Sequence, residues 1–117
     1  MVFGSGGGFT GITNVYKVDK NGNVLKGSGR IDMNYTDAGK IKKSQARKLF
    51  CKMNKVSTTP FSHPGNMYYF ISYFHNDKEI KYTWGENDFK VPEEIITLYR
   101  ETVSKLSKLE YSPVKNN

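Results

Sequence analysis

The chain has 117 residues, a net charge of +7 and an aromatic content of 14%, which suits one packed domain of ordinary size. No apolar run approaches the roughly 20 residues that a membrane-spanning helix needs, and Met1 to Phe3 lead into glycines without the apolar core of a signal peptide. Cys51 is the only cysteine, which excludes an intrachain disulfide and makes a cysteine-based zinc site implausible.

The net charge comes from one segment of the chain. No acidic residue occurs between Asp37 and Asp77. The basic residues of this window are Lys40, Lys42, Lys43, Arg47, Lys48, Lys52 and Lys55. In the rest of the chain, basic and acidic residues are equal in number. Such a concentration of positive charge is a candidate surface for an anionic partner.

A glycine-rich stretch opens the chain: residues 3–12 read FGSGGGFTGI, and the part GGGFTG fits the pattern G-x-G-x-x-G. A dinucleotide-binding loop follows a strand and opens a helix, whereas here only five residues precede the match and a strand-like stretch follows. We therefore predict a structural loop at the start of the first strand, with Phe9 as its anchor. Its residues are Gly6, Gly7, Gly8, Phe9 and Gly11.

The next residues predict a hairpin. Residues 9–20 are rich in Thr, Val, Ile and Tyr, the Asn-Gly of Asn21 to Asn23 is typical of a tight turn, and a second strand runs to about Met33. The stretch NYTDAGK, residues 34–40, is interpreted as a loop.

A basic amphipathic helix is expected over residues 44–56, with Ser44 as its N-cap. Its apolar residues recur at helical spacing: Ala46, Leu49, Phe50 and Met53. The opposite face presents the candidate anion-binding residues Arg47, Lys48, Lys52 and Lys55. Binding of an anion or a nucleic acid through the helix 40–55 is one functional hypothesis; a merely solvated lysine face is its alternative.

The second half repeats the order of elements. Residues 57–66 contain two prolines and predict a loop, MYYFISYFH and EIKYTWG form a hairpin around NDK, and Pro92 begins a second amphipathic helix. We therefore predict one α+β domain over residues 1–111 with ββαββα order. Its four-stranded, mainly antiparallel sheet carries both helices on one face. Residues 112–117 are expected to be a frayed tail.

The second hairpin holds more aromatic residues than one core face usually needs. A partner-binding surface is therefore predicted from the residues Asn66, Tyr68, Tyr73, Tyr82 and Trp84. Packing of these rings against the helices is the alternative for each of them.

Catalytic and metal-binding patterns are weak in this sequence. His63 and His75 have no carboxylate at ligand spacing and are interpreted as surface residues. No Ser/His/Asp arrangement or zinc-protease motif occurs, so neither a catalytic residue nor a metal or other cofactor is predicted. A small enzyme built around Cys51 or a histidine is the third hypothesis.

Four motifs carry a resemblance to a family. FGSGGGFTG at residues 3–11, NGNV at 21–24, PGNMYYF at 64–70 and TWG at 83–85 resemble small bacterial domains found in secreted or lipoprotein-anchored proteins. The resemblance implies a cell-envelope setting outside the cytoplasm, no catalysis, and binding to a protein or other envelope partner. The basic helix and its cysteine are not part of that pattern.

Overall fold

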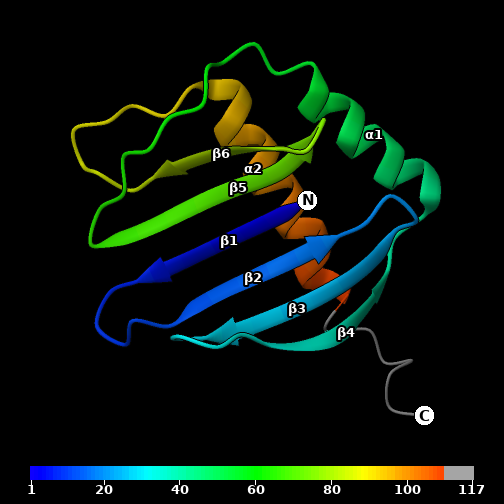
Figure 1. The fold of residues 1–117 in the computed structure, drawn as a ribbon, viewed down its shortest axis with the longest axis horizontal. Helices are drawn as coiled ribbons and strands as arrows, with labels where there is room; N and C mark the ends of the chain where they lie inside the picture. The colour runs from blue at the N-terminus through cyan, green and yellow to red at the C-terminus, as the bar shows by residue number, and fades with distance from the viewer. Residues whose placement is uncertain (110–117) are drawn as a thin grey trace.

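The computed structural model describes residues 1–109 as a single sheet with two helices (Figure 1). The elements in chain order are β1 (Val2–Gly7), β2 (Thr13–Val18), β3 (Asn23–Gly29), β4 (Asn34–Lys40), α1 (Lys43–Asn54), β5 (Met67–His75), β6 (Lys78–Trp84) and α2 (Glu93–Leu109). The frayed tail predicted for residues 112–117 lies outside the described residues. Among the described residues, no helix is long and apolar enough to cross a membrane.

The sheet is antiparallel throughout and has the strand order β4-β3-β2-β1-β5-β6. The predicted α+β class is confirmed. The predicted four-stranded sheet with ββαββα order is wrong, because the sheet has six strands and the order of elements is ββββαββα. The two additional strands are β1, which was predicted as the glycine loop, and β4, which was predicted as an ordinary loop.

Strand β1 lies in the middle of the sheet, between β2 and β5, although it is rich in glycine. On one face, a Cβ atom at Gly4 would lie 2.4 Å from the Cζ atom of Phe70, so a side chain there would collide with the ring. On the other face, Phe3 is fully buried in the core. Glycine thus allows rings of β5 to lie flat across the neighbouring strand, a packing that sequence propensity does not show.

The predicted role of the glycine loop is therefore corrected in two respects. Gly6 and Gly7 belong to β1, and the chain turns at Gly7 and Gly8, which have positive φ angles of 83° and 74°. The Gly8 amide donates a hydrogen bond of 2.8 Å to the carbonyl oxygen of Asn66, which ties this turn to the start of β5. Phe9 is fully exposed at the loop tip and anchors nothing.

Strand β4 was missed because it is a polar edge strand. Most of its residues are exposed, and a bulge interrupts its pairing with β3 between Val24 and Leu25. Only Ala38 is buried, facing the core. A strand with one inward residue carries no period-two hydrophobic signal.

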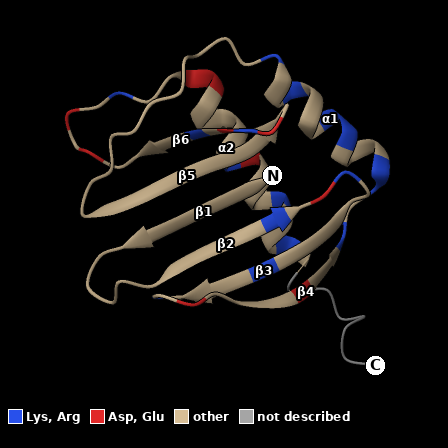
Figure 2. Cartoon of the chain, in the orientation of Figure 1, with Lys and Arg blue, Asp and Glu red and all other residues tan. Residues whose placement is uncertain are grey.

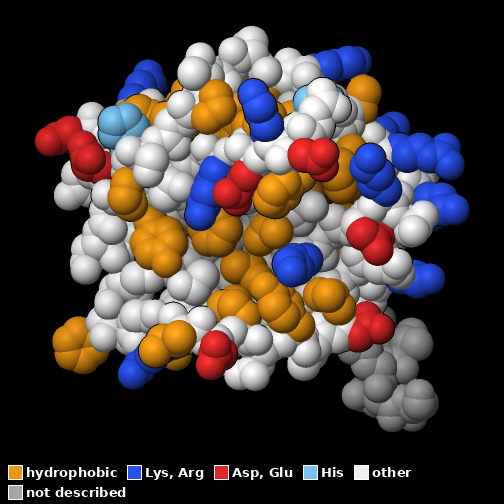
Figure 3. All heavy atoms as spheres, viewed as in Figure 1, with side chains coloured by type: hydrophobic (Ala, Val, Ile, Leu, Met, Phe, Trp, Pro, Cys, Tyr) orange, Lys and Arg blue, Asp and Glu red, His pale blue; other side chains and the backbone are white. Residues whose placement is uncertain are grey.

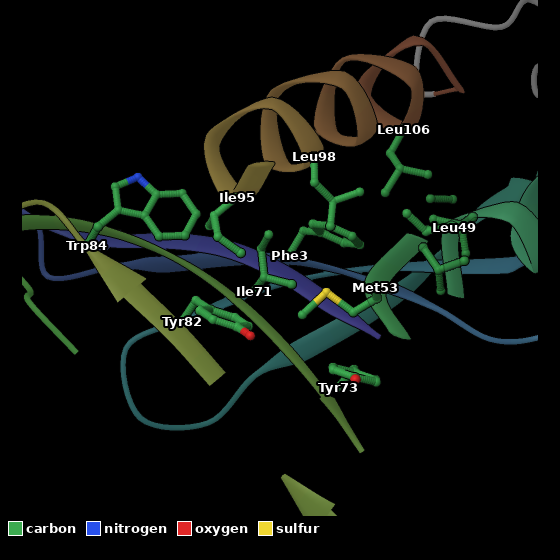
Figure 4. Packing of buried hydrophobic residues seen from close by; sticks show 13 residues of the cluster. Phe3, Leu49, Met53, Ile71, Tyr73, Tyr82, Trp84, Ile95, Leu98 and Leu106 are labelled. Atoms are coloured by element: carbon green, nitrogen blue, oxygen red, sulfur yellow. The ribbon is translucent and has the colours of Figure 1, made fainter. Parts of the chain in front are cut away.

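Both helices cover one face of the sheet and share one core with it (Figure 4). Leu49 and Met53 of α1 and Ile95, Leu98 and Leu106 of α2 belong to the same cluster of buried residues as Phe3 and Ile71 of the sheet. Helix α1 lies toward one end of the sheet and α2 behind its middle (Figure 1). The other face of the sheet has no helix on it, and apolar side chains lie across its middle (Figure 3).

Candidate functional site: a basic groove beside helix α1

An open groove of about 490 Å³ lies between α1 and the end of the sheet where the β2–β3 and β5–β6 turns are located. Its lining residues come from these three parts of the fold: Lys20, Asn21, Lys43, Arg47, Phe50, Cys51, Asn54, Tyr73, Phe74 and His75. Three of them are cations and none is a carboxylate. The groove therefore concentrates positive charge that no lining residue neutralises.

Helix α1 contributes one of its flanks to the groove. Of the four residues in the predicted apolar stripe, Ala46, Leu49 and Met53 are buried, whereas Phe50 is only partly buried. We define the groove flank of α1 as the residues Lys43, Arg47, Phe50, Cys51 and Asn54. Lysine and arginine positions follow α1 along its length (Figure 2). Because the buried stripe of α1 faces the sheet, it determines which of these cations line the groove.

The start of α1 adds to the positive potential. The N-cap is Lys42, not the predicted Ser44, and its backbone N–H donates to Oε1 of Gln45 at 3.1 Å. The first turn contains no acidic residue. A positive side chain at this end has the same sign as the end of the helix dipole, an arrangement that costs stability unless an anion is near.

The β2–β3 turn presents Lys20 and Asn21 to the groove. Asp19 holds this turn: its Oδ1 accepts hydrogen bonds of 2.9 Å from the backbone N–H groups of Asn21 and Asn23, and its Oδ2 accepts one from the Asn23 side chain. The bonds from Asn23 keep the pKa of Asp19 below its ordinary value. This carboxylate is thus occupied within the turn, while the Lys20 ammonium lies 6.0 Å from the centre of the Phe50 ring.

The β5–β6 turn supplies the opposite wall. Asn76 and Asp77 have φ angles of 52° and 64°, as a tight two-residue hairpin requires. Strand alternation then sends Tyr73 into the core and turns the side chain of Phe74, which is 70% exposed, to the helix-free face opposite Glu79.

The predicted anion-binding residues do not form one surface. Arg47 lies in the groove, whereas Lys48 and Lys52 line a hollow toward α2 together with Glu101. Lys55 lines a neighbouring hollow with Glu94 and Glu101. We call Lys48, Lys52 and Lys55 the outer flank of α1; its cations have carboxylates close by.

Several groove residues were not predicted from the sequence as site residues. The acid-free window of the sequence includes Lys43, which was a usable signal. Lys20, Asn21, Phe74 and His75 come from turns far away in the chain, and only the tertiary fold brings them to α1.

The predicted partner-binding surface of aromatic residues is largely internal. Tyr73, Tyr82 and Trp84 are only 7%, 3% and 4% exposed and belong to the core, so they cannot form an exposed surface in this fold. Their side chains pack beneath the helices because they occupy the inward positions of β5 and β6. Tyr68 is half-buried on the other face, where its hydroxyl shares a hydrogen bond of 3.0 Å with that of Thr13; Asn66 is exposed.

The residues of the small-enzyme hypothesis, Cys51, His63 and His75, lie in two separate places. Cys51 is exposed and lines the groove, as does His75, but no hydrogen bond joins them in the described part of the chain. His63 stacks on Phe89 with 4.1 Å between ring centres, and its Nδ1 lies 3.9 Å from the Glu86 carboxylate. Within residues 1–109, no group of three or more potential metal ligands occurs.

Comparison with known proteins gives no match to a family model, to a curated protein or to a solved structure.

Proposed function

We propose that the protein is a non-catalytic binding module that takes an anionic, phosphate-bearing ligand in the groove beside α1. The observation that carries this proposal is the convergence of Lys20, Lys43 and Arg47 on a groove without a lining carboxylate. Arginine offers phosphate two parallel hydrogen bonds, and lysine offers a mobile point charge.

Electrostatics favour an anion at this place. Like charges gathered in one groove repel each other, and the positive end of the α1 dipole adds to them. At 4 Å, two unit charges interact by about 1 kcal/mol in water and by about 4 kcal/mol near a protein surface. A ligand with several phosphates would be attracted by all three cations at once.

Cys51 provides a built-in reporter for the test, since it is the chain's only cysteine and lines the groove. The alkylation rate of its thiol by neutral iodoacetamide would be measured with and without sodium polyphosphate at low salt. We expect polyphosphate to slow the reaction in the wild-type protein, because a bound anion covers the thiol. Protection should vanish in the double variant Lys43→Gln/Arg47→Gln.

The outer flank supplies a matched control. The variant Lys48→Gln/Lys52→Gln removes the same amount of charge from the same helix but leaves the groove intact. It should retain the protection of Cys51. Equal loss in both variants, or no protection in the wild type, would contradict the proposed site.

Exposed apolar loop tips favour a second candidate, a surface for a protein partner in the cell envelope. The β1–β2 and β3–β4 loops lie at the end of the sheet opposite the groove (Figure 1), and their residues Phe9 and Ile31 are almost completely exposed. Met67, beside the exposed Asn66, is 52% exposed at the same end. Large apolar side chains left exposed to solvent in this way are typical of interaction sites.

This second candidate predicts a partner whose binding depends on the loop tips. The wild-type protein and the variant Phe9→Ser/Ile31→Ser would be used as baits in envelope extracts. One protein retained by the wild type and lost by the variant would support it. Identical sets of proteins on both baits would count against it.

A further inference from the structure

The helix-free face of the sheet is built around a row of paired residues that crosses five strands. From β5 to β4 the row reads Phe70, Gly4, Val15, Gly27 and Tyr35. The Phe70 ring fills the space over Gly4. In the same way the Tyr35 ring fills the space over Gly27, where an added Cβ atom would lie 2.6 Å from Cε1 of Tyr35. Both rings therefore lie flat against the sheet, and the middle of this face is apolar (Figure 3).

Further apolar side chains on this face are exposed to solvent. Leu25 and Phe74 point to it, because the residue before each of them is buried in the core beneath the helices. Their side chains are 39% and 70% exposed, and that of Tyr35 is 42% exposed. Neither helix of residues 1–109 covers this face (Figure 1). Apolar area gathered on one face in this way is typical of an interaction surface.

The edges of the face carry charges of opposite sign. A second row of paired residues runs from β6 to β4 as Lys81, Ser72, Val2, Lys17, Leu25 and Asp37. Lys81 and Asp37 are both exposed, and they lie at opposite edges of the sheet in this one row. The face is therefore complementary in charge to a second copy of itself that is turned over about an axis parallel to the strands.

We propose that the helix-free face binds a second copy of this chain in a two-fold dimer, with the axis between the two sheets and parallel to their strands. The axis passes between β1 and β2, so β4 of each copy lies opposite β6 of the other and β3 lies opposite β5. Asp37 of each copy then meets Lys81 of the other. The strands that carry Leu25 and Phe74 also become neighbours, so these exposed side chains pack together. Aligned sheets packed face to face are the arrangement of β-sandwiches.

The size of the face suits a dimer of moderate affinity. Six strands about 4.8 Å apart, each with about six residues at about 3.4 Å per residue, give roughly 500–600 Å² on each copy. Two copies thus bury slightly more than the roughly 1,000 Å² that a specific interface requires. We therefore expect a dissociation constant in the micromolar range.

A nucleic acid fits this face less well, because the charges here balance. Lys17 and Lys81 lie on the face, and the carboxylates of Asp37 and Glu79 lie there as well. The two ammonium groups already lie over aromatic rings of the face, at 4.6 Å and 4.8 Å from the ring centres. A polyanion would meet repulsion as well as attraction, whereas a copy with the same balanced charges meets opposite ones.

The test measures self-association of the full chain by sedimentation velocity. The protein concentration would run from about 1 µM to about 200 µM, which spans the expected dissociation constant. Lys81→Asp and Asp37→Lys each place like charges opposite each other in both contacts of the homodimer, so either change should weaken association by about tenfold or more. An equimolar mixture of the two variants should dimerise again, since each contact then joins a lysine to an aspartate.

The matched control for the charge changes is Lys48→Asp. It makes the same reversal at an exposed position of α1, on the other side of the sheet, and should dimerise as the wild type does. Circular dichroism would confirm that each variant is folded.

A second pair of variants tests the apolar contact. Phe74→Ala should weaken the dimer about tenfold, as the loss of a large ring from the centre of an interface does. Phe9→Ala removes a ring of equal size from an exposed loop tip and should have no effect.

Two results would overturn the inference. The first is a wild-type protein that stays monomeric over the whole concentration range. The second is a dimer that both charge variants leave intact or that their mixture does not restore, because its contacts would then lie elsewhere. These outcomes are separate from anion binding beside α1, since both helices lie on the outer sides of the proposed dimer.

Discussion

The two flanks of helix α1 are both basic, yet their surroundings differ. The groove flank, with Lys43 and Arg47, faces a hollow with no lining carboxylate. The outer flank, with Lys48 and Lys52, shares its hollows with Glu94 and Glu101 of α2. Carboxylates nearby lower the positive potential around a cation. In a groove without carboxylates the positive potential remains and attracts an anionic ligand.

The two basic flanks of α1 therefore do not form a single binding surface. The buried stripe of Ala46, Leu49 and Met53 turns α1 so that its cations separate into two sets, and neighbouring elements decide which set stays uncompensated.

The largest effect is expected from the stripe that positions both flanks. Met53 is 1% exposed between α1 and the sheet, so Met53→Ala should lower the free energy of unfolding by about 2–5 kcal/mol through lost contacts and a cavity. Urea denaturation would measure it. Cys51→Ala, two residues away but exposed, should change stability by no more than about 0.5 kcal/mol. Similar losses in both variants would show that α1 is not packed as described.

A smaller effect, on ligand binding, is expected when a carboxylate is introduced into the groove. Asn54→Asp makes the groove flank resemble the outer flank, and one unfavourable charge contact of about 1 kcal/mol should weaken polyphosphate binding about fivefold. Isothermal titration calorimetry at low salt would measure this. Asn87→Asp changes the net charge equally at an exposed loop position outside the groove and should have little effect. Equal weakening in both would point to net charge rather than to the groove.

The smallest effect concerns a carboxylate near the outer flank. Glu94 Oε2 accepts hydrogen bonds from the Thr58 hydroxyl, the Thr58 N–H at 2.9 Å and the Ser57 hydroxyl at 3.2 Å. These bonds, led by the Thr58 hydroxyl, lower the pKa of Glu94. Because the folded-state pKa is depressed, this stabilisation is present above the ordinary pKa of a glutamate, about 4.3, and is lost as the pH falls through the folded value.

The measurement is the unfolding free energy against pH. Glu94→Gln should be less stable than the wild type at neutral pH, and the difference should shrink in acid. Glu93→Gln, an exposed change one residue earlier, is the control. A difference between wild type and Glu94→Gln that stays constant with pH would contradict this role of the carboxylate.

Sequence patterns predicted part of this picture. The two helices follow from periodicity, because their buried residues recur at helical spacing. The β5–β6 hairpin follows from two runs of β-branched and aromatic residues around a turn. Strand β1 did not follow, since its glycines are explained by the rings of Phe70 and Tyr68 on another strand. Strand β4 was missed because it buries only Ala38.

Only the part of the candidate site that lies on α1 could be predicted from the sequence. The acid-free window indicated α1, and Arg47 was named, but the groove also depends on Lys20 and His75, which come from other elements. The aromatic surplus of the second hairpin suggested a surface, although most of it fills the core beneath the helices. Composition shows how many rings and charges exist, whereas tertiary packing decides which are exposed.

The central claim is that the groove flank, and not the outer flank, binds phosphates. The most direct measurement is the slope of log K against log salt for a labelled 12-nucleotide single strand, used as a phosphate-bearing probe, with the wild type and both double variants. Each lost phosphate contact should reduce the slope by about 0.7, so Lys43→Gln/Arg47→Gln should lower it by about 1.4 and Lys48→Gln/Lys52→Gln should leave it unchanged. Equal slopes for the two variants would contradict the account.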